Sequence, residues 1–301
     1  MPVILAENPR RAALMMVLAT SLFGATSLLA KAIGTGALGA PLHPLQVSFG
    51  RFFFAWLVIV AVFAWARPPL PRRHYPLHFV RTLAGWGGVS LMFAAVAYMP
   101  LSDATALSFL SPVVTMLLAI PLLGERVGPW RWLAAAIALL GAMILLRPGA
   151  EAMQVAGFFA LGAAFAMGLE NVFIKQLTRL EDSLPILLIN NTIGMLIASV
   201  AAAFVWLAPT PAQWAALAGI GVLMIVGQSL FLLAMRLADA SFVAPLFYLV
   251  LAFATIYDFW VFGVRPDGIS FLGAGILVTG ALLLAWREGR ARKRAAQGLS
   301  R

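Results

Sequence analysis

The sequence lacks cysteine altogether, and only 11% of its 301 residues are charged. The absence of cysteine excludes thiolate metal sites, cysteine nucleophiles and disulfides. Soluble domains carry about 25% charged residues and about 45–50% apolar residues. This chain is 62% apolar, so its polar side chains are too few to cover the molecule in water. Composition therefore excludes a soluble enzyme, a disordered chain and a secreted disulfide scaffold.

Long apolar runs fill most of the chain. A helix that crosses a bilayer needs roughly 20 apolar residues. Dividing the sequence at its charged, proline and glycine clusters gives ten runs of about this length: 11–33, 44–66, 77–99, 102–121, 129–147, 153–175, 184–207, 212–236, 240–262 and 268–287. The connections are short, which leaves no room for a soluble domain. We therefore expect an all-α polytopic membrane protein with ten transmembrane helices.

The basic residues are distributed unequally between the two sides of these spans. If the N-terminus is cytoplasmic, 17 of the 21 basic residues lie on or near the cytoplasmic side: Arg10, Arg11, Arg67, Arg72, Arg73, Arg81, Arg126, Arg131, Lys175, Arg179, Arg236, Arg287, Arg290, Arg292, Lys293, Arg294 and Arg301. Such an excess marks the cytoplasmic side. Both termini are therefore expected there. The net charge of +10 then reports topology beside anionic lipids, and it predicts no nucleic-acid partner.

The chain also resembles itself. Residues 99–104 read Met-Pro-Leu-Ser-Asp-Ala, and residues 235–240 read Met-Arg-Leu-Ala-Asp-Ala. The segment 23–31 aligns with 167–175 in the same chain order. Further matches pair Gly124, Arg126, Leu133, Ile137, Gly141 and Leu145 with Gly263, Arg265, Leu272, Ile276, Gly280 and Leu284. We expect two five-span halves, 1–150 and 151–290, followed by a basic cytoplasmic tail, 291–301.

Five spans are an odd number, so the second half enters the membrane in the inverted orientation. Inverted repeats are typical of secondary transporters, because the halves can exchange roles between the inward-open and outward-open states. The repeat therefore predicts transport of a small molecule by alternating access.

Two segments resemble the EamA-type branch of the drug/metabolite transporter superfamily. Residues 51–55 read Arg-Phe-Phe-Phe-Ala, and residues 97–126 run from Ala-Tyr-Met-Pro-Leu-Ser-Asp-Ala to Leu-Gly-Glu-Arg. The second half departs from this pattern, with Val264 where Glu125 would recur and Asn191 where Arg51 would recur. The resemblance implies exporters and exchangers of amino acids, other metabolites and drugs. It also implies a cavity lined mainly by spans 1, 3, 4, 6, 8 and 9, with spans 5 and 10 outside.

Among the charged residues within spans, Glu170, Arg51 and Asp258 are the candidates for function, because an ionisable side chain at bilayer depth is costly. Glu170 could bind a substrate ammonium or carry a coupling proton, or it could pair with Lys175 or Lys31 for structural reasons. Arg51 could hold a carboxylate or satisfy backbone carbonyls. Asp258 lies near a span end and could serve either coupling or solvation.

Spans 4 and 9 each contain a proline among small and hydroxyl residues, and such paired interruptions point to a substrate site. The same stripes could instead serve helix packing. The candidate cavity residues are Phe23, Ser27, Trp86, Ser90, Tyr98, Ser108, Ser111, Pro112, Glu170, Asn171, Asn191, Gln228, Pro245 and Tyr248.

The sequence thus predicts a secondary transporter of the bacterial inner membrane that exports small metabolites. The aromatic residues make the chain resemble the bacterial aromatic amino acid exporters. A multidrug or other metabolite exporter, a passive channel and an intramembrane enzyme remain as alternatives. The enzyme is disfavoured because His43, His74 and His78 lie in loops or at span ends. We expect no catalytic residue, metal or cofactor, membrane lipids and a small-molecule substrate as partners, and a monomer or weak homodimer.

Overall fold

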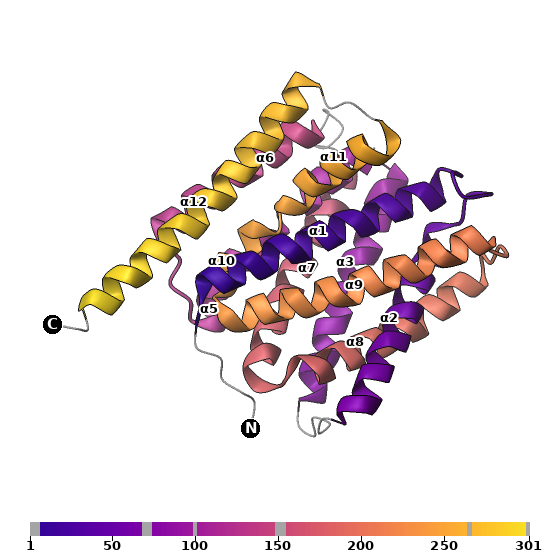
Figure 1. Cartoon of the computed structure of the whole chain (residues 1–301), viewed down its shortest axis with the longest axis horizontal. Helices are drawn as coiled ribbons and strands as arrows, with labels where there is room; N and C mark the ends of the chain where they lie inside the picture. Colours follow the sequence, from indigo (N-terminus) through magenta and orange to yellow (C-terminus); the bar gives the residue numbers. More distant parts are fainter. Residues whose placement is uncertain (1–6, 68–73, 99–100, 148–154, 264–266, 299–301) are drawn as a thin grey trace.

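The computed structural model describes residues 7–67, 74–98, 101–147, 155–263 and 267–298. Within these ranges the chain is helical and contains no strand. Its helices are α1 (Pro9–Gly34), α2 (Pro44–Ala66), α3 (Tyr75–Tyr98), α4 (Leu101–Ser108), α5 (Ser111–Leu123), α6 (Pro129–Leu146), α7 (Val155–Leu180), α8 (Ser183–Ala203), α9 (Pro211–Leu237), α10 (Ala240–Leu246), α11 (Leu249–Phe262) and α12 (Gly268–Gly298) (Figure 1).

These helices form ten spans, because α4 with α5 and α10 with α11 are each one broken span. Nine segments of the described chain are long and apolar enough to cross a membrane. The tenth span is α3, whose 24 residues are also long enough to cross a bilayer. The expected all-α membrane fold is confirmed. One expectation needs refinement: the last helix does not end near residue 287 but continues to Gly298, so most of the expected tail is helical.

Hydrogen bonds between helix ends define two faces of the bundle. At the N-terminal face, Asn8 lies beside Leu237, because its backbone N–H donates to the Leu237 carbonyl, and Arg236 pairs with Asp182. At the opposite face, Gln46 bonds the backbone of Leu207. Helix α1 begins at the N-terminal face, whereas α7 ends there. The first helices of the two halves therefore cross in opposite directions.

Proline and glycine set several helix ends. Pro44 and Pro211 occupy the first turns of α2 and α9, where a missing N–H is harmless and the fixed φ suits a helix. Gly124 ends α5 and Gly263 ends α11, with φ of 68° and 66°. This left-handed conformation favours glycine. The corresponding spans of the two halves thus end in the same way.

Helices α6 and α12 pack against each other at the edge of the molecule, as Figure 1 shows. A Cβ atom on Gly141 would lie 2.5 Å from the backbone nitrogen of Leu277, and one on Gly280 would lie 2.9 Å from that of Ala138. Small residues therefore let the two backbones approach closely. This arrangement agrees with spans 5 and 10 lying outside the transport core.

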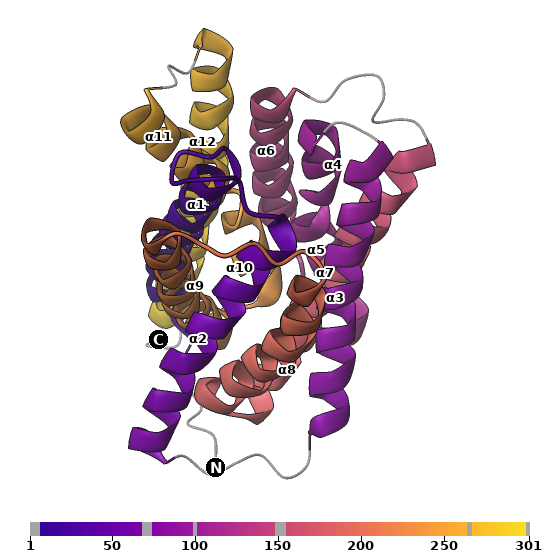
Figure 2. The ribbon, with the colours of Figure 1, turned by 90° about the vertical axis from the view of Figure 1, so that its right-hand side faces the viewer.

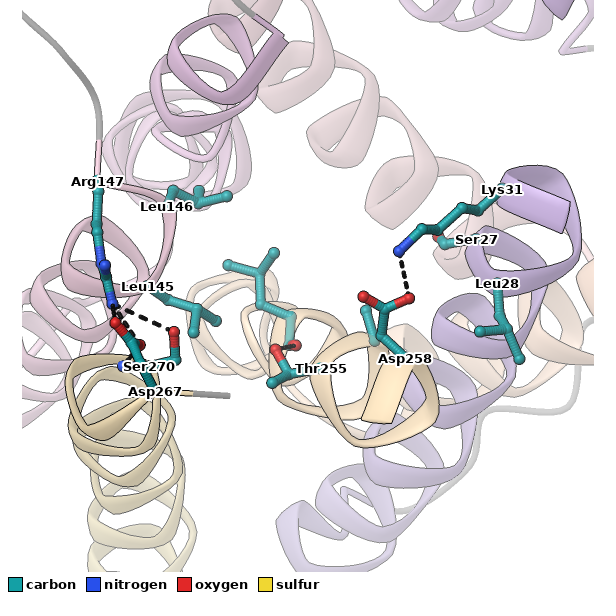
Figure 3. Close-up of a pocket in the computed structure, with 12 residues that line it drawn as sticks. Ser27, Leu28, Lys31, Leu145, Leu146, Arg147, Thr255, Asp258, Asp267 and Ser270 are labelled. Atoms are coloured by element: carbon teal, nitrogen blue, oxygen red, sulfur yellow. Dashed lines mark hydrogen bonds and ion pairs between the residues drawn. The ribbon is translucent and has the colours of Figure 1, made fainter. Parts of the chain in front are cut away.

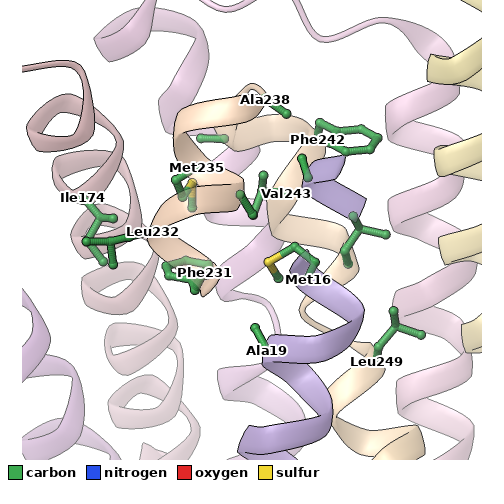
Figure 4. Packing of buried hydrophobic residues seen from close by; sticks show 14 of the residues in the cluster. Met16, Ala19, Ile174, Phe231, Leu232, Met235, Ala238, Phe242, Val243 and Leu249 are labelled. Atoms are coloured by element: carbon green, nitrogen blue, oxygen red, sulfur yellow. The ribbon is translucent and has the colours of Figure 1, made fainter. Parts of the chain in front are cut away.

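A cluster of fully buried side chains closes the bundle near its N-terminal face (Figure 4). Met16 of α1 lies among Met235 of α9, Phe242 of α10 and Leu249 of α11. The side chains of Met16 and Met235 have no exposed surface. The cluster therefore packs α1, α9, α10 and α11 together near this face.

Candidate functional site

A cavity of about 330 Å³ lies between α2, α3, α7, α8 and α9. Figure 2 shows α8 between α2 and α3, three of the helices that line the cavity. Five of the candidate residues line it: Arg51, Trp86, Ser90, Glu170 and Gln228. The resemblance implied a lining from other helices as well. Spans 2 and 7, which are α2 and α8, also line this cavity, although the resemblance did not imply them. No described residue of spans 1, 4 and 9 lines it.

Glu170 has an arginine as its partner within the bundle. Oε1 of Glu170 lies 3.7 Å from Nε of Arg81, whose side chain is only 4% exposed. The expectation that Glu170 would pair with Lys175 or Lys31 is therefore wrong. Arg81 lies on α3, two turns inside the membrane-length helix rather than in the basic loop before it.

Arg51 is the basic residue that lines this cavity. Its guanidinium lies 4.7 Å from the centre of the Phe52 ring, a cation–π contact. The buried Nε of Arg51 has no hydrogen-bond partner, and neither do Nε and Nη1 of Arg81. Buried polar groups normally find partners, and the exceptions call for an explanation. The cavity is thus lined by one guanidinium group and one carboxylate, and the Arg81 guanidinium, which does not line the cavity, contacts that carboxylate. Both arginines keep nitrogen atoms without a hydrogen-bond partner.

Glycine makes room for the charged group. A Cβ atom on Gly85 would lie 2.7 Å from the carboxylate of Glu170. Any larger residue at this position on α3 would displace the carboxylate. On the facing wall, Gly194 of α8 accommodates the ring of Phe52 in the same manner. These glycines let α3 approach the Glu170 carboxylate closely and let α8 approach the Phe52 ring closely.

Asn191 lies behind the cavity wall. Its Nδ2 donates to the carbonyl of Leu187 at 2.8 Å and to Oε1 of Gln228 at 3.3 Å. Asn191 is 1% exposed, whereas its neighbour Asn190 lines the cavity. Asn191 therefore orients Gln228.

The broken spans meet each other away from this cavity. The hydroxyl of Tyr248 donates to the carbonyl of Phe109 at 2.6 Å, and the two rings stack 5.8 Å apart. Pro112 and Pro245 are buried beside the breaks. Three further candidates belong to the same packing: Ser108 donates to the Thr105 carbonyl, the Ser111 carbonyl accepts from Thr115, and Asn171 donates to the Thr115 hydroxyl.

A second cavity, of about 520 Å³, opens near the opposite face (Figure 3). Two ion pairs border it, Lys31 with Asp258 and Arg147 with Asp267. Asp258 is thus partnered rather than free. Hydrogen bonds from Arg147 hold the pKa of the Asp267 carboxyl well below its usual range, and they raise the pKa of Arg147.

The last three candidates are Phe23 and Ser27 on α1, and Tyr98. Ser27 lines the second cavity. Phe23 packs against Phe247 with ring centres 5.9 Å apart. The side chain of Tyr98 lies outside the residues that the structure describes.

A polar clamp holds the turn between α9 and α10 at the N-terminal face. The carboxylate of Glu125 accepts hydrogen bonds from the backbone N–H groups of Ala240 and Ser241 and from the Ser241 hydroxyl. On the other side of the turn, Nζ of Lys175 donates to the carbonyls of Met235 and Ala238. Glu125 is therefore a helix-end contact. Across the described residues, no three histidine or acidic side chains converge as metal ligands.

A bundle of ten spans, two of them broken, around a charged internal cavity defines a membrane transporter. The EamA-like transporter family matches residues 10–147 and again residues 154–286. The chain belongs to this family, as its motifs indicated, and is a multi-pass bacterial membrane protein. A solved crystal structure with 19% identity has the same fold, with a TM-score of 0.77 over 91% of this chain and 96% of that one.

Several characterised relatives are similar over most of their length. The riboflavin transporter of Rhizobium johnstonii is 31% identical over 97% of both chains. The S-adenosylmethionine uptake transporter of Rickettsia bellii is 29% identical over 84% of this chain and 88% of its own. The pseudopaline exporter of Pseudomonas aeruginosa is 26% identical over 90% and 95%. All are named as transporters and none as an enzyme.

Proposed function

We propose that this protein is a secondary transporter for zwitterionic metabolites that carry an amino-acid headgroup on a flat ring. The single observation that carries the proposal is that a buried guanidinium group, Arg51, and a carboxylate, Glu170, line one cavity together with Trp86, while Arg81 lies 3.7 Å from that carboxylate. Charges at this depth are costly and are retained chiefly where they bind something.

Each part of such a substrate has a partner here. A carboxylate accepts from guanidinium N–H groups in a two-pronged geometry, and Arg51 and Arg81 have N–H groups without partners. An ammonium group pairs with Glu170. The rings of Trp86 and Phe52 offer faces for a flat ring. One cavity therefore recognises both charges and the ring.

The relatives support the same chemistry. S-adenosylmethionine carries an amino-acid headgroup and a purine ring, and riboflavin contributes a flat ring system. Aromatic amino acids, the substrates favoured by the sequence, are small members of this class. The sequence also favours export. The named relatives include both uptake proteins and an exporter, so direction is one readout of the experiment below.

We further propose alternating access between two halves, 1–150 and 151–290. The N-terminal face is closed by the Met16–Met235 cluster and by the clamp of Glu125 and Lys175. Rocking of α1 and α2 together with α7 and α8 opens this face and closes the other. One chain supplies the whole cavity, so the transport unit is a monomer.

Counterflow in proteoliposomes tests the proposal. Vesicles loaded with unlabelled L-tryptophan or S-adenosylmethionine are diluted into labelled substrate, and transient accumulation is expected. A channel gives only equilibration, without acceleration by substrate on the far side. Absence of counterflow with every zwitterion tested, from protein that is folded and inserted, overturns the proposal.

Variants connect the activity to the site. Arg51→Gln removes a cationic partner, and loss of a charged hydrogen bond of about 1.5–3 kcal/mol predicts a rise in half-saturation concentration of about tenfold or more. Arg147→Gln, at the exposed ion pair with Asp267, is the matched control and keeps the wild-type value. A multidrug exporter would instead accept lipophilic cations, and Arg51→Gln would strengthen their transport.

A further inference from the structure

Arg51 is a cation without a counterion in the described part of the chain. Glu170 is the carboxylate whose charge acts on Arg51, but the two side chains form no ion pair. Arg81 instead contacts Glu170, with its Nε 3.7 Å from Oε1. Arg81 and Glu170 together carry no net charge. The positive charge of Arg51 is therefore left over at the cavity that Arg51 and Glu170 line.

Neutral groups hold the Arg51 side chain without compensating its charge. Its guanidinium lies 4.7 Å from the centre of the Phe52 ring, and its buried Nε has no hydrogen-bond partner. The face of an aromatic ring attracts a cation, but it does not replace an acceptor for the guanidinium N–H groups. Charged groups within a membrane protein usually have a partner, because burying them alone is costly. The chain thus leaves the place of an anion to a ligand.

The same cavity offers neutral hydrogen-bond donors. Oε1 of Gln228 accepts from Nδ2 of Asn191 at 3.3 Å, and no described residue accepts from Nε2 of Gln228. Ser48, three residues before Arg51 on α2, also lines the cavity. Guanidinium, amide and hydroxyl groups all donate hydrogen bonds. These donors suit a ligand that accepts hydrogen bonds and carries one negative charge.

Ions can reach this cavity from the opposite face. Leu45 and Ala201 line it, and they lie near the start of α2 and the end of α8. Both helix ends belong to the opposite face, where Gln46 bonds the backbone of Leu207. Arg51 lies about two turns further along α2. The cavity therefore connects Arg51 with the helix ends beside water.

We propose that a small inorganic monoanion, with chloride as the test ion, binds beside Arg51 when no substrate is present. The ion supplies the missing negative charge and accepts hydrogen bonds from Arg51 and from Nε2 of Gln228. The carboxylate of a substrate takes the same place, so substrate and chloride exclude each other. This displacement rests on the proposed transport function, whereas binding of the ion does not.

The unfolding midpoint of the purified full-length protein in detergent measures binding of the ion. Chloride replaces gluconate at constant ionic strength, because gluconate is a much larger monoanion. A ligand that binds the folded protein and not the unfolded chain raises the midpoint as its concentration increases. We expect chloride to raise the wild-type midpoint in this way.

Counterflow in proteoliposomes measures the displacement. Chloride at the cavity side is raised from about 10 mM to about 200 mM, with gluconate keeping the ionic strength constant. For a chloride dissociation constant of about 100 mM, competition raises the half-saturation concentration of L-tryptophan about threefold. The maximal rate is expected to stay the same, because saturating substrate displaces the ion.

Three variants locate the ion. Arg51→Gln is expected to lose both chloride effects. Gln228→Met keeps the charge of Arg51 and removes the amide donors, so both effects should become smaller. Arg147→Gln, in the exposed pair with Asp267, removes a positive charge elsewhere and is expected to keep both effects.

The outcomes separate the two proposals. Equal wild-type midpoints in chloride and gluconate overturn the anion site. Chloride effects in Arg51→Gln and Gln228→Met as large as in Arg147→Gln overturn its location. A midpoint that rises with chloride while the half-saturation concentration stays constant overturns the displacement. Absence of counterflow in the wild type overturns the transport proposal, and the midpoints then still decide whether the ion binds.

Discussion

The hydroxyl of Tyr248 donates a hydrogen bond of 2.6 Å to the carbonyl oxygen of Phe109. Phe109 lies in the break between α4 and α5, and Tyr248 lies in the break between α10 and α11. A broken helix leaves backbone carbonyls without helical partners. The tyrosine satisfies one of them across the boundary between the two halves. The two interruptions are therefore parts of one joint.

Tyr248→Phe is expected to weaken this joint while leaving its shape intact. The Phe109 carbonyl loses its side-chain donor at a buried position, which costs about 1–3 kcal/mol. The measurement is the unfolding midpoint of purified protein in detergent. Tyr75→Phe, at a side chain that is 54% exposed, is the control. Equal midpoints for the two variants would contradict the role given to the joint.

Gly85→Ala is expected to impair substrate binding without changing any charge. The added methyl group would lie 2.7 Å from the Glu170 carboxylate and must displace it. Gly87→Ala is the matched control, because a Cβ atom there meets no atom within 4 Å. Glycine in the middle of a helix destabilises a protein by about 0.5–1 kcal/mol relative to alanine. Gly87→Ala is therefore expected to increase the free energy of unfolding.

Counterflow and unfolding measured on these two variants separate binding from folding. Gly85→Ala should show weakened counterflow, whereas Gly87→Ala should match the wild type. Similar counterflow from both would mean that the position of the Glu170 carboxylate does not matter.

Glu125→Gln is expected to loosen the N-terminal face. The amide keeps one acceptor oxygen but turns an –NH2 group toward the N–H groups of Ala240 and Ser241. Losing one charged hydrogen bond costs about 1.5–3 kcal/mol. Asp182→Asn, at a carboxylate that is 48% exposed beside an Arg236 side chain that is 11% exposed, should cost less, about 1 kcal/mol or below. Thermal unfolding of both variants checks this, and an equal loss would count against the clamp.

Glu170 and Arg81 are expected to behave as a coupled pair. Glu170→Gln alone leaves the buried guanidinium of Arg81 without an opposite charge, and breaking a buried pair costs about 3–5 kcal/mol. Adding Arg81→Gln should recover much of the stability and none of the transport. Unfolding midpoints and counterflow of the four proteins form a double-mutant cycle. Additive losses would show that the two residues act independently.

The fold was predictable because hydropathy and chain order determine it. Each apolar run of about 20 residues became one span, and the prolines of spans 4 and 9 marked two real breaks. Arg51, Trp86, Ser90, Glu170 and Gln228 were predicted as site residues and share one cavity. These residues could be predicted because the spacing of residues along a helix shows which of them share a face.

The partners of these residues could not be predicted, because they depend on which helices pack together. Arg81 was counted with the basic loop, although its place five residues inside the span 77–99 was a signal of burial. The same packing brings His78 to Glu181, 103 residues away. Ser108, Ser111 and Pro112 are of the residue types that line a cavity, but they do not line the cavity of Arg51 and Glu170. They lie beside the break between α4 and α5, where the hydrogen bonds of Ser108 and Ser111 are made within their own span.

The most direct test of the central claim is competition for counterflow by three indole compounds that differ only in charge. L-Tryptophan has both an ammonium and a carboxylate group, tryptamine only the first, and indole-3-propionate only the second. A guanidinium group and a carboxylate that line one cavity, Arg51 and Glu170, predict that the zwitterion competes about tenfold or more better than either analogue. Equal competition by all three compounds would contradict recognition of the headgroup by Arg51, Arg81 and Glu170.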